Sequence, residues 1–239
     1  MFRLTALLVA PLLLSACGST ANSSSSQVSP DSSTPSPSTE LPDVKCQGDI
    51  PDPLKATLSD YRLAQPIDFV PAIRQLDQQP RSPDFTFLYG NAKVGCSLVP
   101  ADFNEDGQQD YALLLVNEKT SESQFRLMIN QGNGNFESVV TRDYQKPPET
   151  VEGLVYTAMF FKPPGEMGSA KRKYFPLQEG TSERTTFVAK PAIELWQPSV
   201  ASSPSQELKP ENFQLDNFGH SSEVFYFVDG QLKTIGVSD

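Results

Sequence analysis

A nine-residue loop contains the side chains whose types and spacing most clearly indicate chemistry. It has oxygen-bearing side chains at its first, third, fifth and ninth positions and glycine at its sixth: Asp102-Phe103-Asn104-Glu105-Asp106-Gly107-Gln108-Gln109-Asp110. Alternate residues of a tight loop point to one side, so Asp102, Asn104 and Asp106 are expected to converge. The backbone carbonyl of Gln108 and the carboxylate of Asp110 would complete an all-oxygen shell. Because crowded carboxylates repel one another without a cation, the loop predicts a structural Ca²⁺ site; an acidic surface turn without metal is the alternative.

The residues after the loop argue against an EF-hand. Leu113 stands where the bidentate glutamate of an EF-hand would be, and Tyr111–Val116 predicts a strand where an EF-hand or dockerin has a helix. The stretch from Asp102 to Phe136, which ends in an Asn-x-Gly-x-Gly-x-Phe turn, instead resembles a single FG-GAP/VCBS repeat, the blade unit of integrin-type propellers. This resemblance implies that the five loop residues named above are the calcium ligands. The sequence has no second copy, and a closed propeller needs several blades, so we expect one calcium-binding hairpin inside another fold.

The single histidine is His220, within Gly219-His220-Ser221-Ser222-Glu223. One histidine is enough for general-base catalysis. The segment lacks the second glycine of a nucleophile elbow, however, and its turn-like neighbours predict an exposed loop histidine. We therefore assign no catalytic residue from the sequence.

The amino terminus resembles that of a bacterial lipoprotein. One positive charge precedes the uncharged run Leu4–Leu14, which is too short to cross a bilayer as a helix. The following Leu-Ser-Ala-Cys resembles a lipobox, in which small residues precede the acylated cysteine. The sequence therefore predicts a cleaved signal peptide over residues 1–16 and a lipid, such as palmitate, on Cys17. The alternative is an ordinary secretory signal in which Cys17 is incidental.

Residues 17–42 are rich in Ser, Thr and Pro and too poor in apolar side chains to fold, so they predict a disordered tether. The residue after the cysteine is Gly18 rather than Asp. In a cell with two membranes, lipoproteins with this feature are favoured for the outer one. The remaining residues, 43–239, fit one domain.

The other two cysteines, Cys46 and Cys96, are expected to form a disulfide, because export brings the chain to an oxidising compartment. Free thiols are the alternative. Metal ligation is disfavoured, since neither cysteine has a CxxC partner or a nearby histidine.

The formal net charge of −10 argues against nucleic acid as a partner. Lys171-Arg172-Lys173 is the single basic cluster. Its position after two glycines favours a solvated loop over an anion or lipid-headgroup site.

The elements that would position these residues are short. Helices are expected within 50–61 and over 69–76, the latter with Asp68 as its N-cap. Strands are expected where β-branched and aromatic residues cluster: Phe85–Tyr89, Tyr111–Val116, Phe125–Ile129, Val155–Phe161, Thr185–Val188, Val224–Val228 and Gln231–Ile235. The last two flank Asp229-Gly230, a dipeptide typical of type I′ turns. The fold class expected is α+β, with short N-terminal helices followed by a mainly antiparallel sheet.

These features predict a non-catalytic envelope protein that is anchored by lipid, stabilised by calcium and able to bind an envelope protein or a cell-wall partner. Two alternatives remain open at this point. One is a hydrolase acting on envelope polymers, and the other is a structural or inhibitor-type lipoprotein without metal dependence.

Overall fold

The computed structural model describes residues 49–77, 83–90, 92–93, 95–198, 209–213 and 220–238. All of these lie in one compact unit, Glu40–Asp239. The predicted signal peptide and tether lie outside the described residues, as do Cys17 and Cys46. No helix in the described ranges is long and apolar enough to span a membrane.

The first of two antiparallel sheets has five strands: β1 (Tyr61–Leu63), β2 (Leu98–Ala101), β3 (Asp110–Asn117), β4 (Ser123–Asn130) and β5 (Phe136–Tyr144). Strand β3 is central. One of its edges pairs with β4, which pairs in turn with β5. Its other edge pairs with two short strands: β2 pairs with the first half of β3, and β1 pairs with the second half. The predicted strands Tyr111–Val116 and Phe125–Ile129 are confirmed within β3 and β4.

The second sheet is a meander in the order β6 (Ala158–Lys162), β7 (Ala192–Pro198), β8 (His220–Val228) and β9 (Gln231–Ser238). The hairpin predicted at its end is confirmed. Asp229 and Gly230 have φ angles of 50° and 72°, as a type I′ turn requires. Of the predicted strand Val155–Phe161, only the second part lies in β6, and Val155 forms an isolated bridge to Phe69.

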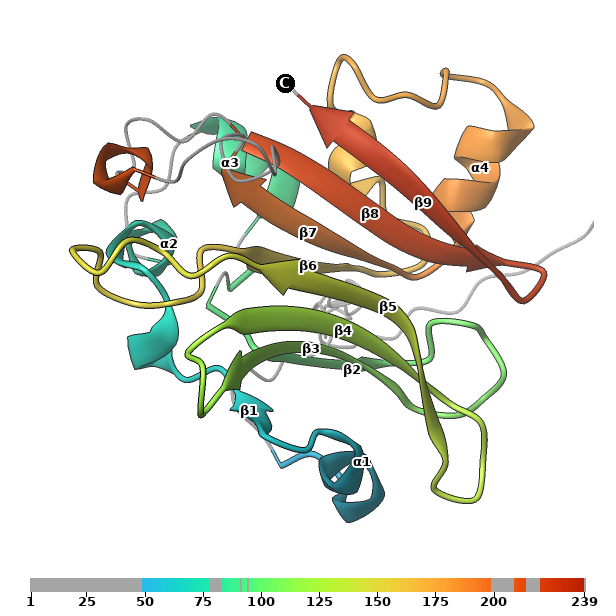
Figure 1. The fold of residues 1–239 in the computed structure, drawn as a ribbon. Coiled ribbons are helices and arrows are strands. Elements are labelled where there is room, and N and C mark those ends of the chain that lie inside the picture. The colour runs from blue at the N-terminus through green and yellow to red at the C-terminus, as the bar shows by residue number, and fades with distance from the viewer. Residues whose placement is uncertain are drawn as a thin grey trace, which may run out of the picture. The chain divides into compact units, whose positions relative to one another are not determined.

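A shared hydrophobic core joins the two sheets. Alternate residues of β3 and β4, such as Leu114 and Phe125, belong to the same buried cluster as Ile193 of β7 and Phe225 of β8. The rings of Phe125 and Phe225 stack with centroids 5.8 Å apart. Figure 1 shows the first sheet mainly in green, with β1 in cyan, and the second mainly in orange and red. Because strand side chains alternate between faces, each sheet has a second face to cover.

Short helices cover those second faces. On the first sheet, Leu54 of α1 (Asp52–Thr57) packs with Leu113 and Leu115 of β3. On the second, Phe187 of α4 (Ser182–Ala189) packs with Tyr226 of β8, beside the 3₁₀ helix η2 (Gly168–Lys171). Phe225, Tyr226 and Phe227 of β8 are all buried, so both faces of this strand are covered. The remaining helical segments are η1 (Pro66–Asp68), α2 (Pro71–Leu76), α3 (Pro83–Tyr89) and η4 (Pro210–Phe213).

Two predicted strands are helices. Phe85–Tyr89 lies in α3, where Pro83 occupies the start of the helix with a φ angle already suited to it. Thr185–Val188 lies in α4, whose N-cap Thr181 accepts a hydrogen bond from the backbone N–H of Arg184 at 3.3 Å. In α4, the N-cap and the packing of Phe187 against Tyr226 outweighed the β-propensity of the side chains.

The predicted helix near residues 69–76 is confirmed as α2, but its N-cap is Val70 and not Asp68. Asp68 instead ends η1, where its carboxylate accepts the backbone N–H of Gln65 at 2.6 Å. The helix expected within 50–61 is α1. The α+β class is therefore confirmed in its coarse form: the described residues form two mainly antiparallel sheets with four short α-helices, and not a closed propeller.

Candidate functional site

The predicted calcium loop connects β2 to β3, and its polar side chains turn inward onto its own backbone. The two carboxylate oxygens of Asp102 accept the backbone N–H groups of Asp106, at 3.0 Å, and Gly107, at 2.8 Å. The side-chain oxygen of Asn104 accepts the Asp106 N–H at 3.2 Å, and the Asp106 carboxylate accepts the Gln108 N–H at 2.8 Å. Gly107 has a φ angle of 85°, a conformation that suits glycine. Asp102, Asn104 and Asp106 thus lie together on one side of the loop.

The fifth predicted ligand, Asp110, is completely buried at the start of β3. One of its carboxylate oxygens accepts the backbone N–H of Phe103, and the other accepts that of Asn130 at the end of β4, both at 2.9 Å. Burial raises the pKa of this carboxyl, and the amide hydrogen bonds oppose that rise. Asp110 therefore ties the start of the loop to the neighbouring strand.

The loop also contacts the second sheet. Phe103 is 1% exposed and meets Phe161 of β6 edge to face, with ring centroids 6.0 Å apart. On the solvent side, Glu105 forms an ion pair with Lys190, the C-cap residue of α4. The loop therefore lies where the two sheets meet, so its conformation bears on how they pack.

The two ends of the segment that resembles an FG-GAP/VCBS repeat lie in contact. Asn130 begins the turn between β4 and β5 and donates its backbone N–H to Asp110. Gly132, two residues later, lies against the Gln108 side chain, since a Cβ at Gly132 would come within 3.4 Å of it. Gly132 and Gly134 both have positive φ angles, 84° and 77°. These two glycines thus allow the chain to reverse direction tightly beside the predicted calcium loop.

The donor chemistry of the loop fits a hard cation, because Asp102, Asn104 and Asp106 present only oxygens as acceptors on one side. Within the described residues, no three His, Cys, Asp or Glu side chains form a group that could hold a metal ion. The two oxygens of Asp110 already accept backbone amides, and a cation would have to share them. No protein-family model, curated protein or solved structure matches this chain. Its function has to be inferred from its own residues.

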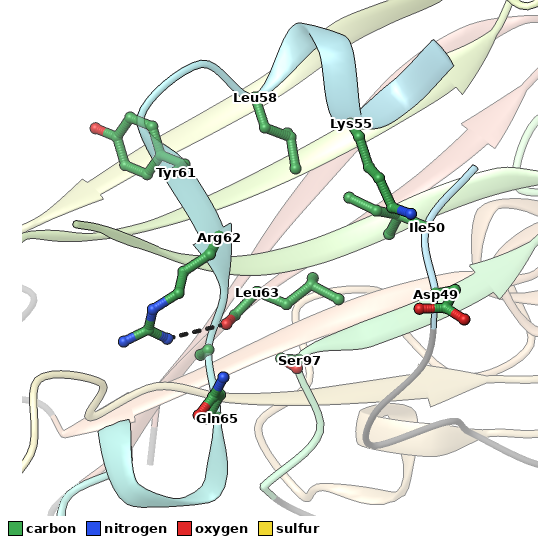
Figure 2. A pocket seen from close by; sticks show the side chains of 10 residues that line it. Asp49, Ile50, Lys55, Leu58, Tyr61, Arg62, Leu63, Gln65 and Ser97 are labelled. Carbon is green, nitrogen blue, oxygen red and sulfur yellow. Dashed lines mark hydrogen bonds between the residues drawn. The ribbon is translucent and has the colours of Figure 1, made fainter. Parts of the chain in front are cut away.

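A pocket of about 580 Å³ lies on the outer side of the first sheet, between α1, β1 and the start of β2. Figure 2 shows its apolar side chains, among them Ile50, Leu58 and Leu63, with Lys55 and Arg62 beside them. The volume is typical of sites for small ligands. The complete lining is Asp49, Ile50, Lys55, Leu58, Tyr61, Arg62, Leu63, Ala64, Gln65 and Ser97.

Arg62 is held in place at one side of this pocket. It donates two hydrogen bonds to the Asp68 carboxylate, at 2.5 and 2.9 Å, and one to the Leu63 carbonyl at 3.1 Å. Burial raises the pKa of Asp68, but hydrogen bonds from Arg62 and from the Gln65 amide outweigh it and hold that pKa below its ordinary value. This ion pair fixes the segment that joins β1 to η1, and with it one wall of the pocket.

The other residues singled out in the sequence are placed only in part. Cys96 is fully buried just before β2, but its expected partner Cys46 lies outside the described residues, so the disulfide stays a prediction. His220 was expected in a loop, and that prediction is wrong: it is the first residue of β8, opposite Pro198. The pairing between β7 and β8 begins before Val224–Val228, the segment that was predicted as a strand, and it includes His220.

Two buried polar arrangements were not predicted. Arg172, Glu194 and Tyr89 meet beneath α3, where the Tyr89 hydroxyl donates to Glu194 at 2.8 Å and Arg172 lies 3.5 Å from the same carboxylate. Burial raises the pKa of Tyr89. Elsewhere, the three N–H groups of the Lys162 ammonium are shared among four backbone carbonyls within hydrogen-bond distance, which belong to Pro163, Glu166, Val188 and Lys190. Neither arrangement has a short-range sequence signal, because its members come from separate elements.

Proposed function

We propose that this chain is a lipid-anchored protein of the bacterial cell envelope, that Ca²⁺ at the loop of residues 102–110 stabilises its fold, and that it acts by binding rather than by catalysis. The observation that carries the calcium part is the convergence of Asp102, Asn104 and Asp106 on one side of a loop that lies between the two sheets. In this proposal those three side chains and the Gln108 carbonyl hold the ion, and Asp110 closes the shell from beneath.

The location of the loop explains why an ion there would stabilise the whole domain. Two loop residues, Phe103 and Asp110, are buried, and Glu105 forms an ion pair with Lys190, the C-cap residue of α4, which covers the second sheet. A cation that binds the folded loop and not the unfolded chain stabilises the fold by mass action. For a site of the weaker extracellular class, with a dissociation constant of about 10⁻⁴ to 10⁻³ M, 5 mM Ca²⁺ would contribute roughly 1–2 kcal/mol.

The test is thermal unfolding of the full-length chain with 5 mM Ca²⁺ and with a chelator. We expect calcium to raise the melting temperature by about 2–8 °C. Asp106→Asn should abolish most of this rise, because it removes a charged ligand while its remaining oxygen still accepts the Gln108 amide. Glu105→Gln, the matched control in the same loop, removes a charge that is not a predicted ligand and should keep the rise. Equal melting temperatures of the unaltered chain in calcium and chelator would refute the calcium proposal.

The pocket between α1, β1 and β2 supports a binding role. It joins apolar side chains to hydrogen-bonding groups, such as Gln65 and Ser97, at a volume suited to a small ligand or to a side chain of a partner. Affinity capture from the native envelope, with the unaltered chain beside Leu63→Asp, would test this role. We expect the variant to lose the specific partner, because a carboxylate there would be buried against apolar neighbours. Capture of the same partner by both chains would place binding elsewhere.

The anchor rests on the lipobox-like Leu-Ser-Ala-Cys sequence. Metabolic labelling with a fatty-acid analogue should mark the unaltered protein and not Cys17→Ser. A labelled variant, or an unlabelled wild-type chain, would contradict lipidation at Cys17.

A further inference from the structure

Two large aromatic side chains extend from neighbouring elements into solvent. Phe87 of α3 is 62% exposed, and Tyr174, just after η2, is 71% exposed. Helices α3 and η2 are in contact. In the described part of the chain these are the two most exposed large hydrophobic side chains, followed by Ile67 at 61%. Contiguous exposed apolar area that is rimmed by polar residues marks sites of protein or membrane interaction.

Each aromatic ring carries a lysine on one face. The Lys171 ammonium lies 5.6 Å from the centre of the Phe87 ring and donates to the Phe87 carbonyl at 3.1 Å. The Lys173 ammonium lies 5.3 Å from the centre of the Tyr174 ring. Both lysines are exposed, and neither forms an ion pair with a carboxylate of the described residues. The surface therefore joins apolar area to two uncompensated positive charges, in a chain whose formal net charge is −10.

Buried neighbours hold this surface in place. Arg172, between the two lysines, is 7% exposed and reaches Glu194. Phe175, directly after Tyr174, is 6% exposed and lies against Phe187 of α4, with ring centroids 5.1 Å apart. The segment is thus fixed on both sides of the exposed side chains, so it differs from the freely solvated loop that its basic residues suggested. One member of the basic cluster, Arg172, is also part of the interior and not of the surface.

We propose that Phe87, Lys171, Lys173 and Tyr174 form a surface that docks on a membrane bearing anionic phospholipid headgroups. Aromatic rings partition to the interface of a bilayer, and exposed lysines beside them meet the lipid phosphates. The proposal goes beyond an acyl anchor, because a tether fixes only how far the domain can move from the membrane. This surface would fix which side of the domain faces it.

Charge favours an anionic membrane over a neutral sugar polymer. An ammonium lies over each of the two rings, so positive charge accompanies the exposed apolar area. Aromatic side chains beside ammonium groups are the usual composition of a membrane interface. At physiological salt, charges beyond about 8 Å are largely screened. The negative net charge of the chain therefore does not prevent two local lysines from binding an anionic surface, where each contributes about fivefold to binding.

The test is co-sedimentation with vesicles of the predicted mature chain, residues 17–239 carrying Cys17→Ser, at 0.15 M salt and in the presence of a chelator; the apolar run Leu4–Leu14 is left out because it would bind vesicles by itself. This chain cannot be acylated at Cys17, and no calcium is available, so the outcome is separate from the anchor and from the calcium loop. One set of vesicles contains phosphatidylcholine with 30% phosphatidylglycerol, and the other contains phosphatidylcholine alone. We expect binding to the anionic vesicles that is at least tenfold stronger than to the neutral ones.

Two variants of that chain test the residues. Lys171→Glu with Lys173→Glu should lower binding at least tenfold, whereas the control Lys146→Glu with Lys233→Glu makes the same change in charge at exposed sites elsewhere and should lower it less than threefold. Phe87→Ser with Tyr174→Ser keeps the charges and should also weaken binding, with melting temperatures checked for every chain. Equal loss in the control, no binding to anionic vesicles, or binding to anionic cell-wall polysaccharide but not to vesicles would each overturn the proposal.

Discussion

Replacing Asp110 by asparagine separates a structural role of this carboxylate from a metal-binding one. Asparagine keeps the shape of the side chain but offers a single acceptor oxygen and an NH₂ group. The two carboxylate oxygens of Asp110 accept the backbone amides of Phe103 and Asn130. In Asp110→Asn one of these buried amides must face a donor, whichever way the new side chain is turned.

The size of the effect follows from two opposing terms. A hydrogen bond to a charged group contributes about 1.5–3 kcal/mol, and a buried amide left without an acceptor costs about 1–3 kcal/mol. Against this loss, the variant no longer buries a charge, and that burial is what raises the pKa of Asp110. We therefore expect the lower part of the range, a loss of about 2 kcal/mol. For a domain of this size that corresponds to a fall in melting temperature of about 4–8 °C.

The assay is thermal unfolding of the full-length chain in a chelator, followed by circular dichroism. The matched control is Asp229→Asn at the exposed turn between β8 and β9, where asparagine tolerates the φ angle of 50°. That variant should stay within about 0.5 kcal/mol of the unaltered chain. If Asp110→Asn is as stable as the control in chelator and loses stability only relative to the calcium-bound form, Asp110 acts solely as a ligand and the structural argument is wrong.

Three further outcomes are expected. Lys162→Met should cost about 1–3 kcal/mol in urea unfolding at pH 7, because it leaves buried carbonyls without a donor. Since burial lowers the pKa of Lys162 to about 8, the difference in unfolding free energy between the unaltered chain and the variant should grow as the pH rises from 8 towards 10. A difference that stays constant over this range would contradict the pKa shift. Asp68→Asn should destabilise the fold at pH 7 through loss of the pair with Arg62. Because the pKa of Asp68 is depressed in the fold, this stabilisation is fully present above the unfolded pKa near 4 and is lost as the pH falls through the lower folded pKa. A difference between the two chains that does not shrink as the pH falls below about 4 would be evidence against the pair. Removal of the predicted Cys46–Cys96 disulfide by a double serine variant should cost about 4 kcal/mol, which unfolding with and without reductant measures. A free-thiol count of two in the unfolded Cys17→Ser chain would show that the bond is absent.

The strands with strong local patterns were predictable, and the misassigned segments show what local patterns omit. Tyr111–Val116 and the last hairpin have dense β-branched and aromatic residues with clear turn signals, and both are strands. Thr185–Val188 has the same composition but is a helix, because Thr181 caps it and Phe187 packs against Tyr226. The capping threonine with an acidic first turn was a readable signal, whereas the contact with Tyr226 depends on a strand about 40 residues away.

The candidate site also combines features that the local sequence predicts with features that depend on distant elements. The spacing of Asp102, Asn104 and Asp106 was enough to place three side chains on one side of a loop, because that arrangement is set by the local backbone. The role of Asp110 was not predictable, since its second hydrogen bond goes to Asn130 in another strand. The pocket and the surface around Phe87 were not predictable either, because each combines residues from separate elements.

The same hydrogen bonds also bear on how strongly the loop can bind calcium. Backbone amides already bind both carboxylate oxygens of Asp102 and of Asp110, and one of Asp106. These amides reduce the repulsion between the carboxylates, so the loop can hold its shape without an ion. An ion that arrives must then share oxygens with these donors and gains little from relieving charge repulsion. The expected site is therefore weak, in the range of about 10⁻⁴ to 10⁻³ M, and filled only where calcium is abundant, as it is outside the cell. A dissociation constant below about 10⁻⁶ M by calorimetry would mean that the loop rearranges around the ion and that the amide network described above is replaced on binding.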